Sequence, residues 1–266
     1  MEDIKFKKQY GQNFIFDTNL LKAIVNDAQI GSESEVLEIG VGVGSLTKFL
    51  SEKAKKVVSY EIDRSLQPKI EENLKNFNNS TVIYKDIMLA SCQEINSYFD
   101  DSFAIVANLP YYITTPIIFK FLEEKYNLTS LTIMVQKEVG ERICAKEKNK
   151  DYGILSVMIQ SFADVKIVRY INRNMFIPSP NVDSCLVKID LKNKFNISDR
   201  EKYRNFIKQC FSMRRKTLTN NLKGFCSKDK LIFSLNSLSL KENIRSEEIS
   251  IENFVKLYNL LDGSSL

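Results

Sequence analysis

The sequence predicts an α/β protein with a parallel sheet, followed by a small helical domain at the C-terminal end. Short apolar segments alternate with amphipathic segments over roughly the first two-thirds of the 266 residues. The apolar segments are nearly continuous, as in parallel strands that are buried on both faces. Beyond Leu191 the strand patterns stop, so we expect one domain of residues 1–191 and a second of residues 192–266.

The expected elements follow in chain order. Asp17 is a candidate cap for the first helix, whose apolar residues recur on one face. Strands are expected over 35–40, 56–62, 81–86, 103–108, 130–136, 164–171 and 184–191. Helices are expected over 17–28, 45–53, 63–77, 114–126, 152–163, 199–222 and 250–261. Pro68 is able to shorten or kink the third helix.

Composition excludes several classes of function. The chain has no histidine, which rules out Ser-His-Asp and Cys-His catalysis and any histidine-bound metal. Its five cysteines are scattered without C-x-x-C spacing, so we expect neither a zinc site nor a disulfide framework. No apolar run is long enough to span a membrane, and "MEDIKFKKQY" lacks the apolar region of a signal peptide. We therefore expect a cytoplasmic protein with no metal in its site.

Positive charge is concentrated in the C-terminal part. The net charge is +5, but the segment from Lys192 to Lys230 holds twelve Lys or Arg and only three Asp or Glu. The rest of the chain is therefore slightly acidic. This asymmetry is typical of a domain that binds a phosphate-rich partner, although a solvated basic helix face gives the same pattern.

A glycine loop and two acids predict a cofactor pocket. "EIGVGVGSLT" places Gly40, Gly42 and Gly44 after the first strand, with the third glycine one residue too early for the dinucleotide pattern G-x-G-x-x-G. Glu61 ends the second strand and suits a ribose diol, while Asp86 ends the third and suits an adenine amino group. Each acid alone fits an ordinary exposed carboxylate or a helix cap. Together with the glycines they predict a site for an adenosine-containing cofactor.

The fourth strand ends in "ANLPYY". If the cofactor is S-adenosylmethionine, the oxygen of Asn108 and the carbonyl of Leu109 are placed to polarise an adenine amine, whose lone pair is conjugated with the ring. Pro110 makes this turn rigid, and Tyr111 offers a ring for stacking on a flipped base. The alternative is that Asn108 caps a helix and the tyrosines belong to the core. Glu38, two residues before Gly40, is expected to orient the loop or to meet a cationic part of the ligand.

These motifs resemble those of the bacterial small-subunit (16S) ribosomal RNA adenine dimethyltransferases. The similarity includes "QYGQNFIFD", "EIGVGVGSLT", "NLPY", "QKEV", "YGILSV", "FIPSPNVDS" and "RRKTLTNNL", in that order, over about residues 7–222. It implies a class I, Rossmann-like methyltransferase fold that uses S-adenosyl-L-methionine. It also implies dimethylation of the exocyclic amines of two adjacent adenines near the 3′ end of the rRNA. The implied substrate is a late assembly intermediate of the 30S subunit, and a monomer is expected.

The resemblance also assigns residues. The cofactor is expected to contact Asn13, Ile15, Gly40, Glu61, Asp86 and Asn108. The target adenine is expected to contact Asn108, Leu109, Pro110, Tyr111 and, as a second aromatic wall, Phe176. The basic residues expected to bind rRNA phosphates are Lys5, Lys7, Lys8, Arg214, Arg215 and Lys216. The chain departs from the family pattern at Ile15, Val41 and Tyr112, and the last of these is expected to alter the rim of the pocket.

Three other functions stay open from the sequence. A large-subunit rRNA adenine methyltransferase conferring macrolide resistance shares the N-terminal motifs, but "YGILSV" and "RRKTLTNN" are less like that group. A second alternative is a ribosome-assembly factor whose binding matters more than its catalysis. The third is an NAD-dependent reductase, which the glycine spacing and the absence of histidine disfavour.

Overall fold

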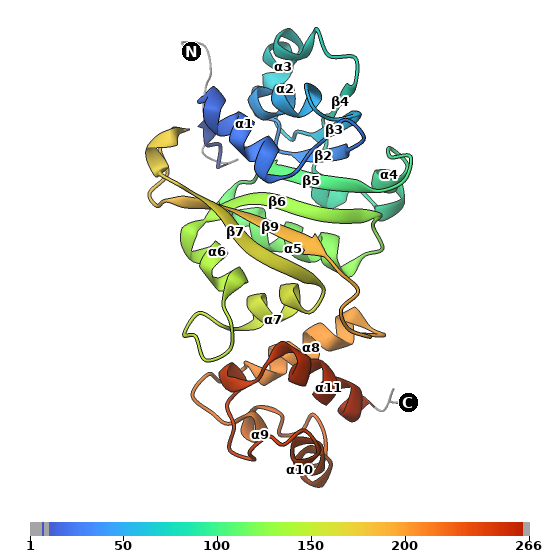
Figure 1. The fold of residues 1–266 in the computed structure, drawn as a ribbon, viewed down its shortest axis with the longest axis vertical. Helices are drawn as coiled ribbons and strands as arrows, with labels where there is room; N and C mark the ends of the chain where they lie inside the picture. The colour runs from blue at the N-terminus through green and yellow to red at the C-terminus, as the bar shows by residue number, and fades with distance from the viewer. Residues whose placement is uncertain (1–6, 8–10, 263–266) are drawn as a thin grey trace. The chain divides into compact units, whose positions relative to one another are not determined.

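The computed structural model describes Lys7 and residues 11–262, with only the backbone of Asp262. These residues form two compact units (Figure 1). Unit 1 comprises Met1–Gly140 and Lys166–Asp190, and unit 2 comprises Glu141–Val165 and Leu191–Leu266. Unit 1 contains a large sheet and unit 2 is mainly helical, so the α/β class with a helical C-terminal part is as predicted.

A seven-stranded sheet of order β4-β3-β2-β5-β6-β9-β7 is the centre of unit 1. Its strands are β2 (Glu35–Ile39), β3 (Lys56–Tyr60), β4 (Ser80–Ile83), β5 (Phe103–Asn108), β6 (Leu128–Gln136), β7 (Ala163–Ile171) and β9 (Ser184–Leu191). The five strands from β4 to β6 run parallel, as predicted, and β9 pairs antiparallel with β6. Because β2 lies between β3 and β5, the strand order reverses there, and ligands bind at the carboxyl ends of strands beside such a reversal.

Helices connect the strands of unit 1. They are α1 (Thr18–Asp27), α2 (Ser45–Ser51), α3 (Gln67–Leu74), α4 (Cys92–Asn96), α5 (Thr114–Glu123) and α6 (Lys137–Cys144). Asp17 caps α1 as predicted, since its side chain accepts a hydrogen bond from the Leu20 amide at 2.7 Å. Helices α4 and α6 were not predicted, because α4 is short and α6 continues directly from β6.

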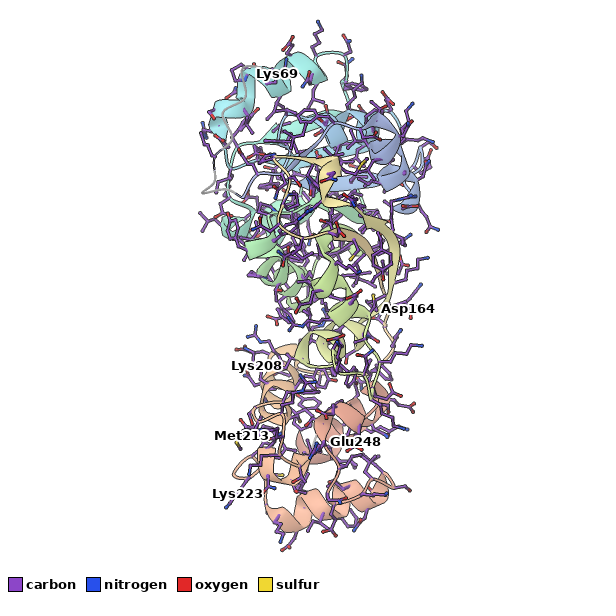
Figure 2. All side chains as sticks on the ribbon, turned by 90° about the vertical axis from the view of Figure 1, so that its left-hand side faces the viewer. Lys69, Asp164, Lys208, Met213, Lys223 and Glu248 are labelled. Carbon is purple, nitrogen blue, oxygen red and sulfur yellow. The ribbon has the colours of Figure 1, made fainter. Side chains whose placement is uncertain are left out.

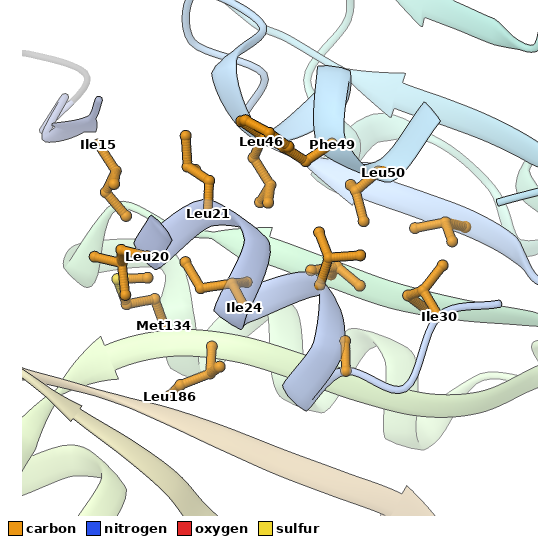
Figure 3. Close-up of a cluster of buried hydrophobic side chains, with 14 of the residues drawn as sticks. Ile15, Leu20, Leu21, Ile24, Ile30, Leu46, Phe49, Leu50, Met134 and Leu186 are labelled. Atoms are coloured by element: carbon orange, nitrogen blue, oxygen red, sulfur yellow. The ribbon is translucent and has the colours of Figure 1, made fainter. Parts of the chain in front are cut away.

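One core cluster joins α1 and α2 to the sheet. Figure 3 shows side chains of both helices packed with Met134 of β6 and Leu186 of β9. The same cluster contains Val36, Val57 and Val106, which are fully buried. The intervening residues of the strands, such as Leu37 and Ile105, are also fully buried, so the sheet is covered on both faces.

Two short strands join segments that are far apart in the sequence. Strand β1 (Phe14–Ile15) pairs antiparallel with β8 (Phe176–Ile177), placing Ile15 opposite Phe176. Neither segment has the length or alternation that predicts a strand. This pairing fixes the N-terminal segment at its position in unit 1.

Unit 2 contains α7 (Ile154–Gln160), α8 (Arg200–Cys210), α9 (Leu218–Asn221), α10 (Lys228–Ser237) and α11 (Ile251–Asp262). The division between Asp190 and Leu191 lies near the expected boundary at residue 192, and the structure also places Glu141–Val165, which was expected in the first domain, in unit 2. Residues 141–165 belong to unit 2 because they contact its C-terminal helices. The Tyr152 hydroxyl donates to the Ile249 carbonyl at 2.9 Å, and the hydroxyls of Ser161 and Tyr203 are 2.8 Å apart.

The continuous helix predicted over 199–222 is wrong. The chain leaves α8 after Cys210 and enters α9 only at Leu218, with Thr217 as a new cap. Its side chain accepts a hydrogen bond from the Asn220 amide, which satisfies a donor at the start of α9. Helix α10 was not predicted either. The basic "MRRK" stretch therefore lies in a loop between helices.

Candidate active site

A cavity lies at the carboxyl ends of β2, β3 and β5, where the strand order reverses. The predicted residues in its wall are Asn13, Ile15, Gly40, Glu61, Asp86, Asn108, Leu109 and Pro110. Tyr112, which was expected at the rim of the pocket, also lines it. Residues of the wall that were not predicted include Gln12, Phe14, Ile62 and Met88. A parallel sheet brings successive strand ends to one edge, which is why side chains far apart in the sequence meet here.

Backbone geometry explains the glycine loop. Gly40, Gly42 and Gly44 all have positive φ, at 83°, 60° and 83°. A Cβ atom at Gly42 would lie 2.7 Å from Cε1 of Phe14, and one at Gly40 would lie 3.4 Å from the carbonyl oxygen of Asn108. Side chains at these positions would therefore fill the cavity or push its wall apart. The loop is built for close approach of a ligand to the backbone.

Glu61 holds the glycine loop in place. One carboxylate oxygen accepts from the Gly42 amide and the other from the Asp63 amide, each at 2.8 Å. The side chain is 6% exposed, and its burial raises the pKa although these two backbone donors lower it. Each oxygen retains a lone pair, so the carboxylate remains able to accept from a ribose diol.

Asp86 begins the single turn Ile87–Leu89 beyond β4. One of its oxygens accepts from the Met88 amide at 2.8 Å, which orients the carboxylate at the cavity wall. Within the described residues the second oxygen accepts no hydrogen bond. Glu61 and Asp86 thus each hold a turn by accepting backbone hydrogen bonds and retain capacity to accept further ones. A capping role and a cofactor-binding role are therefore compatible.

Glu38 is placed beneath the loop and not in the cavity wall. It is 0% exposed, and one oxygen accepts from the hydroxyls of Thr47 at 2.6 Å and Ser59 at 2.8 Å. Its other oxygen has no partner among the described residues. Burial raises the pKa of Glu38 to about 8, outweighing the two hydroxyls that lower it. Burial thus favours the neutral form of Glu38, and its hydrogen bonds join β2 to α2 and β3. Because the side chain does not line the cavity, the structure supports the expected orienting role and not contact with a cation.

Asn108 has a defined orientation. Its side-chain amide donates to the carbonyl oxygen of Asn13 at 2.8 Å, and because a carbonyl can only accept, the amide nitrogen must be the atom at this position. The Asn108 oxygen accepts no hydrogen bond within the described residues, so it is the acceptor that is left for a ligand. Asn13 in turn donates to the Gly11 carbonyl at 3.3 Å.

The aromatic residues divide between two environments. The Tyr111 and Ser184 hydroxyls are hydrogen-bonded at 2.7 Å, and Tyr111 is half-buried without lining the cavity. Tyr112, by contrast, lines the cavity and is 61% exposed. Phe176 is 2% exposed and packs in the cluster around α1, so it lines no part of this cavity. Strand β8 buries Phe176 against the core in this structure, and its assignment as a second aromatic wall for the adenine stays a prediction.

The N-terminal segment is anchored beside the cavity. The Lys7 ammonium donates to Asp63 at 2.7 Å and to Ser65 at 2.8 Å, and the Gln12 side chain donates to Asp63 at 3.0 Å. Burial raises the pKa of Asp63, but the hydrogen bonds from Lys7, Ser65 and Gln12 together outweigh this and hold it below its usual range. Lys7 thus fastens this segment to the turn after β3. Lys5 and Lys8 lie outside the described residues.

The predicted basic residues of unit 2 lie on the loop between α8 and α9. Arg214, Arg215 and Lys216 are exposed. Arg214 donates to the carbonyl of Lys150 and lies 3.8 Å from Glu247. Lys208, Met213 and Lys223 project on one side of this unit in Figure 2.

A second basic loop of unit 2, after α6, was not among the residues predicted to bind RNA. Its lysines, Lys146, Lys148 and Lys150, are exposed, and the Lys148 amide donates to the Glu247 carbonyl at 2.8 Å. Only tertiary contact brings these lysines beside Arg214.

The described residues hold no group of acidic, cysteine or histidine side chains arranged to bind a metal. None of the described helices is long and apolar enough to cross a membrane.

The fold and site together define a class I methyltransferase. A glycine loop follows β2, acids follow β3 and β4, and the Asn-Leu-Pro-Tyr motif begins at the last residue of β5. Comparison with known proteins makes the assignment specific. The family model described as "Ribosomal RNA adenine dimethylase" matches residues 3–263. The chain therefore belongs to the ribosomal RNA adenine dimethylase family, whose members are S-adenosylmethionine-dependent enzymes.

Individual relatives agree with this family. Ribosomal RNA small subunit methyltransferase A of Bacillus cereus (strain B4264) is 45% identical over 267 residues, covering 96% of this chain and 91% of the relative. A dimethyladenosine transferase from Plasmodium falciparum superposes with a TM-score of 0.80 at 28% identity, covering 92% and 95% of the two chains. The 23S rRNA methyltransferase ErmE superposes with a TM-score of 0.73 at 25% identity, covering 94% and 100%.

Proposed function

We propose that this enzyme dimethylates the exocyclic amines of two adjacent adenines near the 3′ end of small-subunit (16S) rRNA. The observation that carries the proposal is the side-chain oxygen of Asn108, which accepts no hydrogen bond from the residues that the structure describes and is oriented by the bond from the Asn108 amide nitrogen to Asn13 at the edge of the cofactor cavity. The Bacillus relatives named for the small subunit are 45% identical to this chain, whereas ErmE is 25% identical. Identity therefore favours the small subunit as substrate over the large subunit.

The cavity suits S-adenosylmethionine. Glu61 and Asp86 offer acceptors for the ribose hydroxyls and the adenine amine, and the glycine loop leaves room for the ligand along its backbone. Asn13, Ile15 and Gly40 complete the contacts that we assign to the cofactor. When bound, the cofactor supplies an activated methyl group on a sulfonium. The protein's contribution is then position and electrostatics.

The residues after β5 prepare the adenine. The oxygen of Asn108 and the carbonyl of Leu109 accept from the two N–H groups of the amine, which draws its lone pair out of conjugation with the ring. Pro110, at φ −56°, keeps this turn rigid. Tyr111, held by Ser184, stacks on the base. No histidine base is needed, because the nitrogen releases its proton readily once it is methylated.

Basic residues place the RNA. We assign phosphate contacts to Arg214, Arg215 and Lys216 in unit 2, the part that we propose as the RNA-binding domain. We assign further phosphate contacts to Lys5, Lys7 and Lys8. The substrate that we propose is the rRNA within a late assembly intermediate of the small subunit, in the cytoplasm, acted on by a monomer. A role in assembly is compatible with catalysis by the same chain.

The first test follows a labelled methyl group. Undermethylated small subunits and large-subunit RNA are incubated with labelled S-adenosylmethionine and the wild type, Asn108→Ala, or the control Asn236→Ala on α10. We expect label in adjacent dimethyladenines of small-subunit rRNA, with at least a hundred-fold loss for Asn108→Ala and none for the control (roughly the cost of one positioned polar group). Label only in large-subunit RNA would reject the substrate and favour the resistance activity.

The RNA contacts have their own test. Arg214→Glu/Arg215→Glu should weaken binding to the small subunit and leave affinity for S-adenosylmethionine unchanged. Lys53→Glu/Lys75→Glu changes the charge equally at exposed positions of unit 1 and serves as the control. Equal weakening by both pairs would mean that net charge, and not this loop, governs binding.

A further inference from the structure

The ring of Tyr112 forms an exposed aromatic surface on the wall of the cofactor cavity. It is 61% exposed and lies in the turn Tyr111–Ile113, directly after the Asn-Leu-Pro motif. Single exposed apolar side chains are common on protein surfaces, so exposure alone indicates nothing. Here two further exposed apolar side chains, Ile62 and Met88, line the same cavity, so the rim as a whole offers apolar surface.

Gly11 supports this ring from one side. Gly11 has a φ of +57°, and a Cβ atom there would lie 3.3 Å from Cε1 of Tyr112 and 3.4 Å from Cβ of Pro110. The backbone of the N-terminal segment therefore lies against the ring. Within the described residues no hydrogen bond involves the Tyr112 hydroxyl. Packing holds the ring, and the rest of its surface is accessible to a ligand.

The side chains of Tyr111 and Tyr112 point in different directions and contact different parts of unit 1. Successive residues of a 3₁₀ turn point about 120° apart, because the turn has three residues. Tyr111 accordingly reaches Ser184 at the start of β9, whereas Tyr112 lies against Gly11. One planar base cannot stack on both rings. If Tyr111 stacks on the target adenine, Tyr112 is available for another base.

We propose, on the basis of the proposed function, that Tyr112 stacks on the base of the nucleotide next to the adenine being methylated. A nucleotide that leaves its helix loses stacking partners, and so does its neighbour. An aromatic side chain replaces such a partner without reading sequence. The substrate has two adjacent adenines, so for one of the two targets the base on the Tyr112 side is the other adenine, a purine.

Steady-state kinetics with undermethylated small subunits separates this role from a structural one. Tyr112→Ala should raise KM for the subunits about ten-fold, within the roughly 5- to 150-fold range of one lost stacking contact. The values of kcat and of Kd for S-adenosylmethionine should stay near those of the wild type. Tyr112→Phe should behave as the wild type, since the hydroxyl makes no hydrogen bond in the described part of the chain. Tyr170→Ala is the matched control, because Tyr170 is 60% exposed on β7 and lines no part of the cavity.

A second substrate identifies the stacked base. In subunits that carry uridine beside the target adenine, stacking is weaker, so Tyr112→Ala should cost several-fold less in KM than with the natural neighbour. An equal cost in both substrates would overturn the proposal, as would an unchanged KM. A loss of cofactor affinity that accounts for the whole effect would also overturn it and make Tyr112 a wall of the cofactor site. If the wild type labels no small-subunit adenine, the proposed function fails as well, whereas an active wild type with an indifferent Tyr112→Ala rejects the stacking role alone.

Discussion

Replacing Glu38 by glutamine is expected to remove a pH dependence from the stability of unit 1. The carboxyl is fully buried, and among the described residues only the hydroxyls of Thr47 and Ser59 contact it by hydrogen bonds. Burial raises its pKa to about 8 from an ordinary value of 4.5. Glutamine has nearly the same shape, accepts from both hydroxyls through its oxygen, and cannot ionise.

The sign and size follow from proton linkage. Between the two pKa values the folded protein binds one proton more than the unfolded chain, so the free energy of unfolding falls as the pH rises. The decrease is about 1.4 kcal/mol per pH unit for one proton. From about pH 5.5 to pH 7 the wild type should therefore lose roughly 2 kcal/mol relative to Glu38→Gln. Above about pH 8 the difference should level off, and below about pH 4.5 it should be constant.

Denaturant unfolding of both proteins across this pH range measures the difference. Other titrating groups, including Glu61, are present in both proteins, so their contributions largely cancel. A difference that does not change between about pH 5.5 and pH 7 would refute the reasoning, because Glu38 would then ionise with an ordinary pKa in the folded state. A difference that changes with the opposite sign would mean that the folded site favours the carboxylate.

Two further substitutions test the site. Gly42→Ala should destabilise the protein by about 1–3 kcal/mol, from the left-handed backbone and the clash with the Phe14 ring, and should lower cofactor affinity. Gly31→Ala adds a Cβ that meets no atom of the described residues within 4 Å, so it should change neither the denaturation midpoint nor the calorimetric Kd. Equal behaviour of the two variants would contradict the account. Ser184→Ala frees the Tyr111 hydroxyl and should lower kcat several-fold at unchanged cofactor Kd (about 1 kcal/mol for one hydrogen bond). An unaffected kcat would show that this bond does not position Tyr111.

Much of the fold follows from local patterns. The alternation of apolar strands with amphipathic helices predicted the parallel sheet, and β9 was predicted with the bounds that the structure shows. The errors occur where a local pattern is ambiguous. The basic stretch after Cys210 has a helical composition, but the structure ends α8 there, and Thr217 begins a new helix.

The sequence by itself determined which strand ends carry the glycines, the acids and the Asn-Leu-Pro-Tyr motif, because residue order alone sets this in a parallel sheet. Only the tertiary structure decided how the side chains are used. It buries Glu38, which raises the pKa of the carboxyl, and it fixes the Asn108 amide through a carbonyl far away in the sequence. It also separates Tyr112 from Tyr111 and buries Phe176. Burial, ionisation and side-chain direction depend on segments that meet only after folding, so no local pattern records them.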